Sequence, residues 1–220
     1  MKTLIISFTA MMLCSTGSFS QTVYKIPFAS SGNKIELTVS NSSSLPAKYV
    51  NIKAVEFPSW VKIKEIEQAV GEISSNDEKL FVFEFDVDKK APVNKEETIK
   101  FLVTSGESTK GTSDSWSKEI KIKAGAPDKY ELYQNYPNPF NPSTTISYQL
   151  PQDSRVTVKI YDVLGREVSK LLDEDKVAGY YEQKFSASRF ASGIYIYRLM
   201  AKSKSTGNEF TSIKKMLLLK

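Results

Sequence analysis

The chain has 220 residues, a formal net charge of +5 at pH 7, no histidine and a single cysteine, Cys14. This length fits two domains of about 100 residues each, and a domain of that size normally buries enough surface to fold without disulfides or metal. The absence of histidine, and of any cysteine beyond Cys14, excludes imidazole and thiolate metal sites and the Ser–His–Asp and Cys–His nucleophiles.

The first twenty residues have the three-part pattern of a signal peptide. Lys2 precedes an apolar stretch from Leu4 to Cys14, and small and polar residues follow up to Ser20. An apolar stretch of about 11 residues is too short to span a bilayer as a helix. We therefore expect residues 1–20 to be a signal peptide cleaved after Ser20, rather than a buried first strand. The mature chain is then expected to have no transmembrane span. Leu13 before Cys14 argues against a lipid anchor, which requires a small residue there.

Residues 21–125 have the pattern of an antiparallel β-sandwich. Apolar and polar residues alternate in short runs, the period expected for strands with one buried face, and turn-forming or charged residues separate the runs. No long stretch has the 3.6-residue period of a helix. The predicted strands are Ile35–Val39, Tyr49–Val55, Val61–Ile66, Leu80–Val87, Thr98–Thr104 and Trp116–Ile122.

Aromatic residues in this segment suggest two alternatives. Phe81, Phe83 and Phe85 lie on one side of a predicted strand, and Trp60 begins another. Such a row could form a carbohydrate platform, but in a sandwich it more often forms half of the core, which is the interpretation we favour. The Gly/Ser/Thr-rich stretch 105–115 reads as a flexible hairpin loop that could serve either as a solvated connection or in binding.

Two short acidic runs, Asp86–Asp88 and Asp173–Asp175, could supply oxygen ligands to calcium. Both lack the glycine turn of a calcium loop, and each is followed by a lysine, so we predict no metal site there. Elsewhere Lys and Arg are interleaved with Asp and Glu, and removal of Lys2 leaves a net charge of +4. This distribution favours an ordinary solvated surface over a nucleic-acid-binding patch.

The first segment loosely resembles the immunoglobulin-like modules of secreted bacterial proteins. The resemblance lies in four short stretches of the sequence: Leu37–Asn41, Pro58–Val61, Ala91–Asn94 and Trp116–Ile120. It implies a fold, and only a general role as a structural, adhesive or binding module.

A linker is expected at residues 124–128, where small residues precede Pro127, so the second domain should cover residues 126–220. Pro137, Pro139 and Pro142 make residues 134–142 a rigid, irregular lead-in that cannot pair as a central strand. Three aromatic rings in and before it, those of Tyr133, Tyr136 and Phe140, are expected to anchor it to the domain.

About seven strands are expected in this domain, which makes it a second sandwich. Asp162–Gly165 should form the turn of a hairpin, with Val156–Ile160 on one side and Arg166–Leu172 on the other. The remaining predicted strands are Tyr180–Phe185, Ile194–Ala201 and Phe210–Leu219.

Four motifs in this domain resemble the type A C-terminal sorting domain of the type IX secretion system. They are Gln134–Pro142, Tyr161–Arg166, Ala191–Leu199 and Lys215–Lys220, and their order and C-terminal position behind a signal peptide match that family. The resemblance covers roughly residues 130–220. The fold is also similar to the immunoglobulin-like part of flagellar hook-capping proteins.

The resemblance implies export by a Gram-negative bacterium. The family's members cross the inner membrane, fold in the periplasm and are recognised by an outer-membrane translocon. A sortase-type surface protease commonly removes the domain and can attach the cargo to surface polysaccharide. Gly193, Tyr195, Lys215 and Lys220 match the glycine–tyrosine and terminal lysine positions of the pattern. We expect Gly193 to permit a backbone bend, Tyr195 to pack inside, and the two lysines to be exposed.

The sequence thus predicts two immunoglobulin-like antiparallel β-sandwich domains in tandem after a signal peptide. We expect a non-enzymatic protein of the cell surface or extracellular space, without a cofactor. The alternative is a secreted carbohydrate-active enzyme or carbohydrate-binding accessory protein, since paired carboxylates, Ser–Lys catalysis and an oxygen-ligand calcium site are all possible without histidine.

Overall fold

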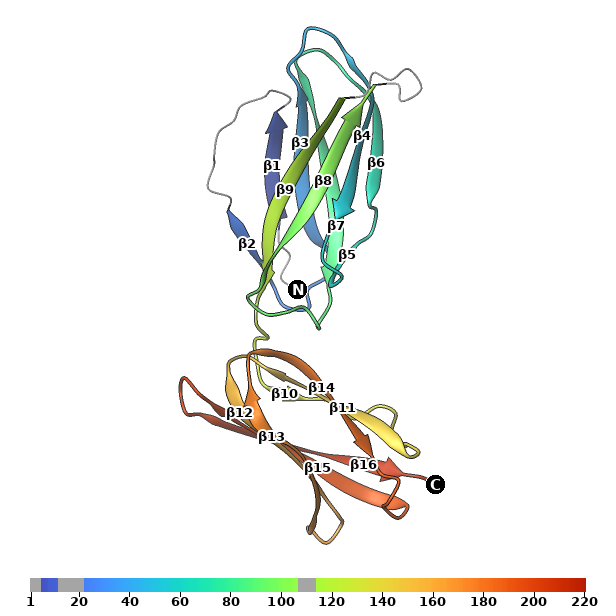
Figure 1. Cartoon of the computed structure of the whole chain (residues 1–220), viewed down its shortest axis with the longest axis vertical. Coiled ribbons are helices and arrows are strands. Elements are labelled where there is room, and N and C mark those ends of the chain that lie inside the picture. The colour runs from blue at the N-terminus through green and yellow to red at the C-terminus, as the bar shows by residue number, and fades with distance from the viewer. Residues whose placement is uncertain (1–4, 12–21, 107–113) are drawn as a thin grey trace. The chain divides into compact units, whose positions relative to one another are not determined.

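The computed structural model of the chain describes residues 22–106 and 114–220, together with the backbone of residues 5–11 (Figure 1). These described residues form strands, turns and loops and contain no helix, so none of them forms a helix that could cross a membrane. The all-β class predicted from the sequence is confirmed. The chain divides into two compact units, Met1–Gly125 and Ala126–Lys220.

The first unit consists of two sheets facing each other. One sheet has the strand order β1-β3-β7-β5, and the other has the order β2-β9-β8-β4-β6. The strands are β1 Ile5–Met11, β2 Val23–Ile26, β3 Asn33–Asn41, β4 Ala47–Glu56, β5 Val61–Ile63, β6 Glu67–Ile73, β7 Asp77–Val87, β8 Glu96–Ser105 and β9 Asp114–Ala124.

Alternation of side chains along each strand builds the core of the first unit. In β3 every second residue from Asn33 is buried, and β7 follows the same pattern from Phe81 to Val87. Phe83 is fully buried, and its ring lies 4.8 Å from that of Phe101 on β8. The two sheets therefore share one apolar layer, as a sandwich requires.

Strand β1 lies within the predicted signal peptide. It pairs in parallel with β3, from Ile5 opposite Lys34 to Met11 opposite Ser40. Export and cleavage of residues 1–20 remain predictions, and Cys14 and Ser20 lie outside the described residues. Most of the predicted flexible loop 105–115 also lies outside them.

One predicted strand of the first unit is wrong in its extent. The run Val61–Ile66 does not form one strand, because β5 ends at Ile63 and a strand absent from our prediction, β6, begins at Glu67. Strand β6 is the edge of the other sheet, pairs only with β4 and buries only Ile73. An edge strand with so few buried positions has no clear apolar alternation to detect.

The second unit is a smaller sandwich of two sheets, with strand orders β10-β11-β14 and β13-β12-β15-β16 (Figure 1). Its buried side chains come from both sheets and form a core separate from that of the first unit. The strands are β10 Glu131–Leu132, β11 Ser143–Leu150, β12 Ser154–Tyr161, β13 Glu167–Lys176, β14 Gly179–Ser186, β15 Gly193–Ser203 and β16 Glu209–Leu218.

The predicted turn at Asp162 is present and explains how β12 and β13 join. The Asp162 carboxylate accepts hydrogen bonds from the backbone N–H groups of Leu164 and Arg166, at 2.9 and 3.0 Å, and pairs with the Arg166 guanidinium at 2.7 Å. Gly165 adopts a positive φ of 79°, which a side chain would disfavour. The turn is therefore fixed by its own sequence.

A candidate sorting site around the last strand

The proline-containing segment closes the open edge of the last strand, β16. The Phe140 N–H donates to the Leu217 carbonyl at 2.9 Å, and the Leu219 N–H donates to the Phe140 carbonyl at 3.0 Å. The Asn138 side-chain oxygen accepts from the Leu217 N–H, and the Gln134 amide donates to the Lys215 carbonyl. Backbone groups that an edge strand would otherwise present are thus satisfied by residues about eighty positions earlier.

A buried tyrosine holds the same segment from inside. The Tyr197 hydroxyl on β15 donates to the Tyr133 carbonyl and accepts from the Asn135 N–H, each at 2.9 Å. Tyr197 is fully buried, and this burial raises the pKa of its hydroxyl to about 12. One hydroxyl therefore satisfies both a donor and an acceptor of an irregular backbone, which would be costly to bury unpaired.

A second polar contact fixes the segment at its prolines. The side chain of Asn135, which is 2% exposed, donates to the Pro137 carbonyl and to the Thr144 hydroxyl, both at 3.0 Å. The Thr144 hydroxyl donates in turn to the same carbonyl at 2.8 Å. The peptide bonds before Pro137 and Pro139 are both cis. The segment is therefore irregular, as its prolines predicted, and side-chain hydrogen bonds hold it in place.

The predicted aromatic anchors behave differently from one another. Phe140 is buried, with its ring 6.1 Å from that of Phe185, and Tyr133 is half-buried with its hydroxyl bonded to Gln149. The prediction for Tyr136 is wrong, because its side chain is 83% exposed. The backbone of Tyr136 exchanges two hydrogen bonds with that of Thr145, both at 3.0 Å, so this position is held without the ring.

Two of the four predicted sorting residues begin strand β15. Gly193 has a φ of 151°, in the region that favours glycine, and an added Cβ would meet no neighbour within 4 Å. Backbone conformation, not lack of space, is therefore its constraint. Tyr195 is buried, donates to the Ala191 carbonyl at 2.8 Å and packs edge-on against Phe190.

Of the other two predicted residues, Lys215 lies near the end of β16 and Lys220 lies two residues after its end, and both are exposed. Lys215 pairs in register with Ile196, the residue after Tyr195, and its carbonyl accepts the hydrogen bond from Gln134. The Lys220 ammonium donates to the Ser188 carbonyl at 2.8 Å, and its backbone N–H donates to the Ser192 hydroxyl. The fold thus gathers parts of three of the four motifs, 134–142, 191–199 and 215–220, at one end of the β15–β16 pair.

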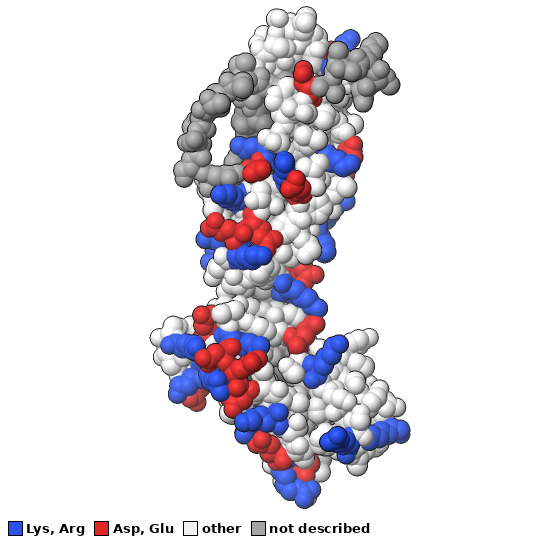
Figure 2. Space-filling view, viewed as in Figure 1, with Lys and Arg blue, Asp and Glu red and all other residues white. Residues whose placement is uncertain are grey.

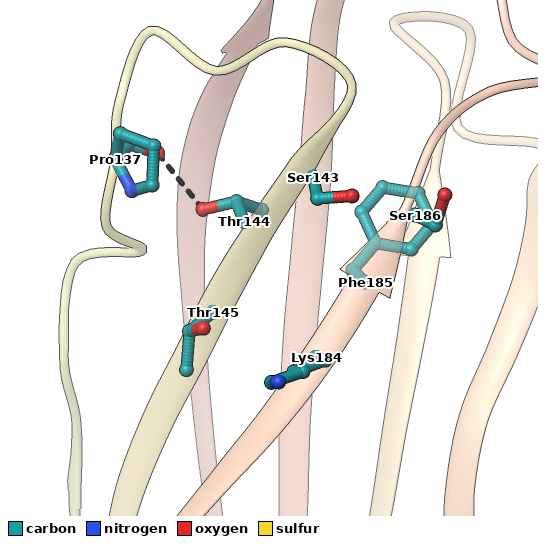
Figure 3. A pocket seen from close by; sticks show the side chains of 7 residues that line it. All are labelled: Pro137, Ser143, Thr144, Thr145, Lys184, Phe185 and Ser186. Atoms are coloured by element: carbon teal, nitrogen blue, oxygen red, sulfur yellow. Dashed lines mark hydrogen bonds between the residues drawn. The ribbon is translucent and has the colours of Figure 1, made fainter.

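A shallow cavity of about 410 Å³ lies beside the proline segment (Figure 3). Pro137 borders it on one side, and strands β11 and β14 contribute the rest of its lining. Its lining is mostly apolar, and Ser143, Thr145 and Lys184 add hydroxyl groups and a cation to it. Sequence reasoning missed this cavity, because outward-facing Ser and Thr on a strand are ordinary surface residues.

The four aromatic residues considered as a carbohydrate platform are all buried. Phe81, Phe83 and Phe85 are 4% exposed or less, which confirms the core interpretation. Trp60 is 6% exposed and donates its indole N–H to Glu97 at 3.2 Å, beside a cavity of about 420 Å³. A ring buried in this way cannot stack flat on a sugar.

The two acidic runs are engaged with protein groups. Asp86 accepts from the Gly32 N–H, while Asp173 pairs with Arg155 and Asp175 with Lys204. Hydrogen bonds from Lys170 and Arg155 hold the pKa of Asp173 below its usual value. Figure 2 shows the same interleaving of opposite charges over the visible face of the molecule.

The second unit is defined by a β-sandwich in which a proline-containing segment and the C-terminal residues close one edge together. Residues 134–214 match the family described as the secretion system C-terminal sorting domain. The predicted recognition is confirmed: this unit carries a type IX secretion C-terminal sorting domain. Such a domain implies interaction with the type IX machinery and export to the cell surface or extracellular space.

Comparisons over the whole chain are weaker. No curated protein matches it. Among solved structures, dimeric latent PorU from Porphyromonas gingivalis is 14% identical with a TM-score of 0.35, and the match covers 92% of this chain but 19% of PorU. A protein of unknown function from Porphyromonas gingivalis W83 is 12% identical with a TM-score of 0.36, covering 91% of this chain and 96% of that one. The CupB2 chaperone of Pseudomonas aeruginosa is 12% identical with a TM-score of 0.30, covering 91% and 98%. At these values the likenesses add nothing to the assignment.

Proposed function

We propose that the protein is a non-enzymatic cargo of the type IX secretion system. In this proposal residues 1–20 direct the chain across the inner membrane and are removed after Ser20, and the chain then folds in the periplasm. The outer-membrane translocon recognises residues 126–220, and a sortase-type surface protease then removes them. The single observation that supports the proposal most is the sorting-domain match over residues 134–214.

The supporting geometry is the joint closure of β16 by residues far apart in sequence. A receptor that contacts this end of the domain would meet the proline segment, the start of β15 and the C-terminal lysines together, and so would meet only a folded domain. Gly193 and Tyr195 serve mainly to build this end, while Lys215 and Lys220 are placed on its surface. Exposed lysines suit an acidic receptor surface.

A reporter fusion tests the sorting function. A signal peptide, a reporter and residues 126–220 are joined and expressed in a bacterium that has the type IX system. We expect the reporter outside the cell, and in the periplasm when residues 126–220 are absent. If both fusions stay in the periplasm to the same extent, the proposal is refuted.

For residues 21–125 we propose a structural, adhesive or binding role. The buried aromatics and the small, regular strand pattern support this role over that of a carbohydrate-active enzyme. A screen of the chain against polysaccharides, including those of the exporting bacterium's own surface, distinguishes a binding module from an enzyme. Saturable binding without turnover fits the proposed module, whereas turnover abolished by a carboxylate substitution in this unit would establish the enzyme instead.

A further inference from the structure

The outer face of strands β15 and β16 is unusually apolar for the solvent side of a sandwich. In a strand with one buried face and one solvent-facing side, the solvent-facing residues are normally polar. Here five of them are aliphatic or methionine side chains, of which Ile213 is 58% exposed, Ile194 51% and Met200 37%. We call this surface the β15/β16 outer face, and its apolar members are Ile194, Ile196, Met200, Ile213 and Leu217.

Strand register makes these side chains one continuous surface. Ile194 lies opposite Leu217, and Ile213 lies opposite Arg198, which stands between Ile196 and Met200 on the same side of β15. Side chains directly opposite each other across a strand pair are close enough to touch. Exposed apolar surface that is contiguous, rather than scattered, marks an interaction site.

Two cations stand within this face without a carboxylate partner. Across residues 22–106 and 114–220, no Asp or Glu pairs with Arg198 or Lys215. The neighbouring carboxylates are engaged elsewhere, since Glu167 pairs with Lys159 and Glu209 with Lys202. The face is therefore apolar and positively charged.

Arg198 is held in place before any partner arrives. Its guanidinium lies over the Tyr161 ring, 4.9 Å from the ring centroid, and donates to the Tyr161 hydroxyl. Its Nε is buried without a hydrogen-bond partner. Its neighbours are Ile213 opposite on β16 and Lys159 opposite on β12, so apolar groups and a second cation border it. A fixed cation in such surroundings binds a carboxylate more strongly than a solvated one and loses less entropy on binding.

We propose that the β15/β16 outer face is the surface by which the type IX outer-membrane machinery holds the sorting domain, through an apolar partner surface that carries carboxylates. The inference rests on the proposed sorting function and deepens it. A second copy of the chain is a poorer occupant, because a two-fold contact across this face would bring Arg198 and Lys215 towards the same cations of the other copy.

The test compares export of full-length variants in a type IX host. Ile213→Glu places a negative charge in the apolar surface. The new carboxylate lies opposite Arg198 and can form an ion pair with it, so the domain should still fold. Val177→Glu is the matched control, because Val177 is 65% exposed in the β13–β14 turn, outside this face. We expect Ile213→Glu to lower surface delivery about tenfold or more, as loss of one buried aliphatic side chain implies, and Val177→Glu to export normally. Normal export of Ile213→Glu would overturn the proposal.

A charge series at Lys215 tests the acidic character of the partner and does not depend on the behaviour of Ile213→Glu. We expect export to be highest with lysine or arginine at position 215, lower in Lys215→Gln and lowest in Lys215→Glu. Equal export of the Gln and Glu variants would overturn the inferred partner charge. A concentration-dependent dimer of the purified chain, broken by Ile213→Glu, would identify the face as a self-interface and also overturn the proposal. If deletion of residues 126–220 leaves export unchanged, the sorting function itself fails, which is a result distinct from these.

Discussion

Removal of one hydroxyl, in Tyr197→Phe, should destabilise the second unit without opening a cavity. The ring is fully buried and keeps its packing, but the Tyr133 carbonyl loses its donor and the Asn135 N–H loses its acceptor. A buried polar group left unpaired costs about 1–3 kcal/mol. Because two groups are affected and backbone relaxation recovers part of the loss, we expect the free energy of unfolding to fall by about 2 kcal/mol. For a domain of this size the melting temperature falls by about 8–16 °C.

Scanning calorimetry of the chain measures this change, and tryptophan fluorescence provides an internal reference. Both tryptophans, Trp60 and Trp116, belong to the first unit, so the transition that they report should not move. Tyr180→Phe is the control substitution, since its hydroxyl makes an exposed contact of 3.4 Å with Glu182. If Tyr197→Phe costs no more stability than Tyr180→Phe, the proline segment is not held by this hydroxyl.

Three further predictions concern the same unit. Burial raises the pKa of Tyr197 to about 12, whereas an unfolded tyrosine titrates near 10. The contribution of this shift to the free energy of unfolding should therefore be fully present below pH 10 and be lost as the pH rises towards 12. In denaturant titrations, Tyr197→Phe should make this loss of stability smaller. Gly193→Val should cost about 1–3 kcal/mol by calorimetry through backbone strain, although space is open, and an unchanged transition would contradict this. Phe140→Ala should cost about 3–5 kcal/mol and expose the unit to limited proteolysis, while the neighbouring Tyr136→Ala should not.

Much of the fold could be predicted because local sequence and tertiary packing agree. Alternation in β7 and β12 marks the buried faces, and Asp162 and Gly165 specify the turn between β12 and β13 without help from the rest of the domain. Strand β6 could not be predicted in the same way. It pairs through its backbone at a sheet edge, and its side chains carry little trace of that pairing.

The candidate site was only partly visible in the sequence. Motif order located Gly193, Tyr195, Lys215 and Lys220, and the expectation that Tyr195 packs inside came with the resemblance to the sorting-domain family. What the residues touch depends on long-range register, which no local pattern contains. The contact of Gln134 with the carbonyl of Lys215 spans most of the domain, and the exposure of Tyr136 follows from how the segment turns.

The closure of β16 by residues 134–140 has a consequence for the order of events during synthesis. Met216 and Leu218 enter the core, and the backbone on either side of Leu218 completes the hydrogen bonds of Phe140. A chain truncated before β16 contains all the strands of the first unit. Its second unit, however, lacks an edge strand and part of its core. Under the proposed sorting function, a receptor that contacts this closed edge can therefore bind the domain only after β16 has been made.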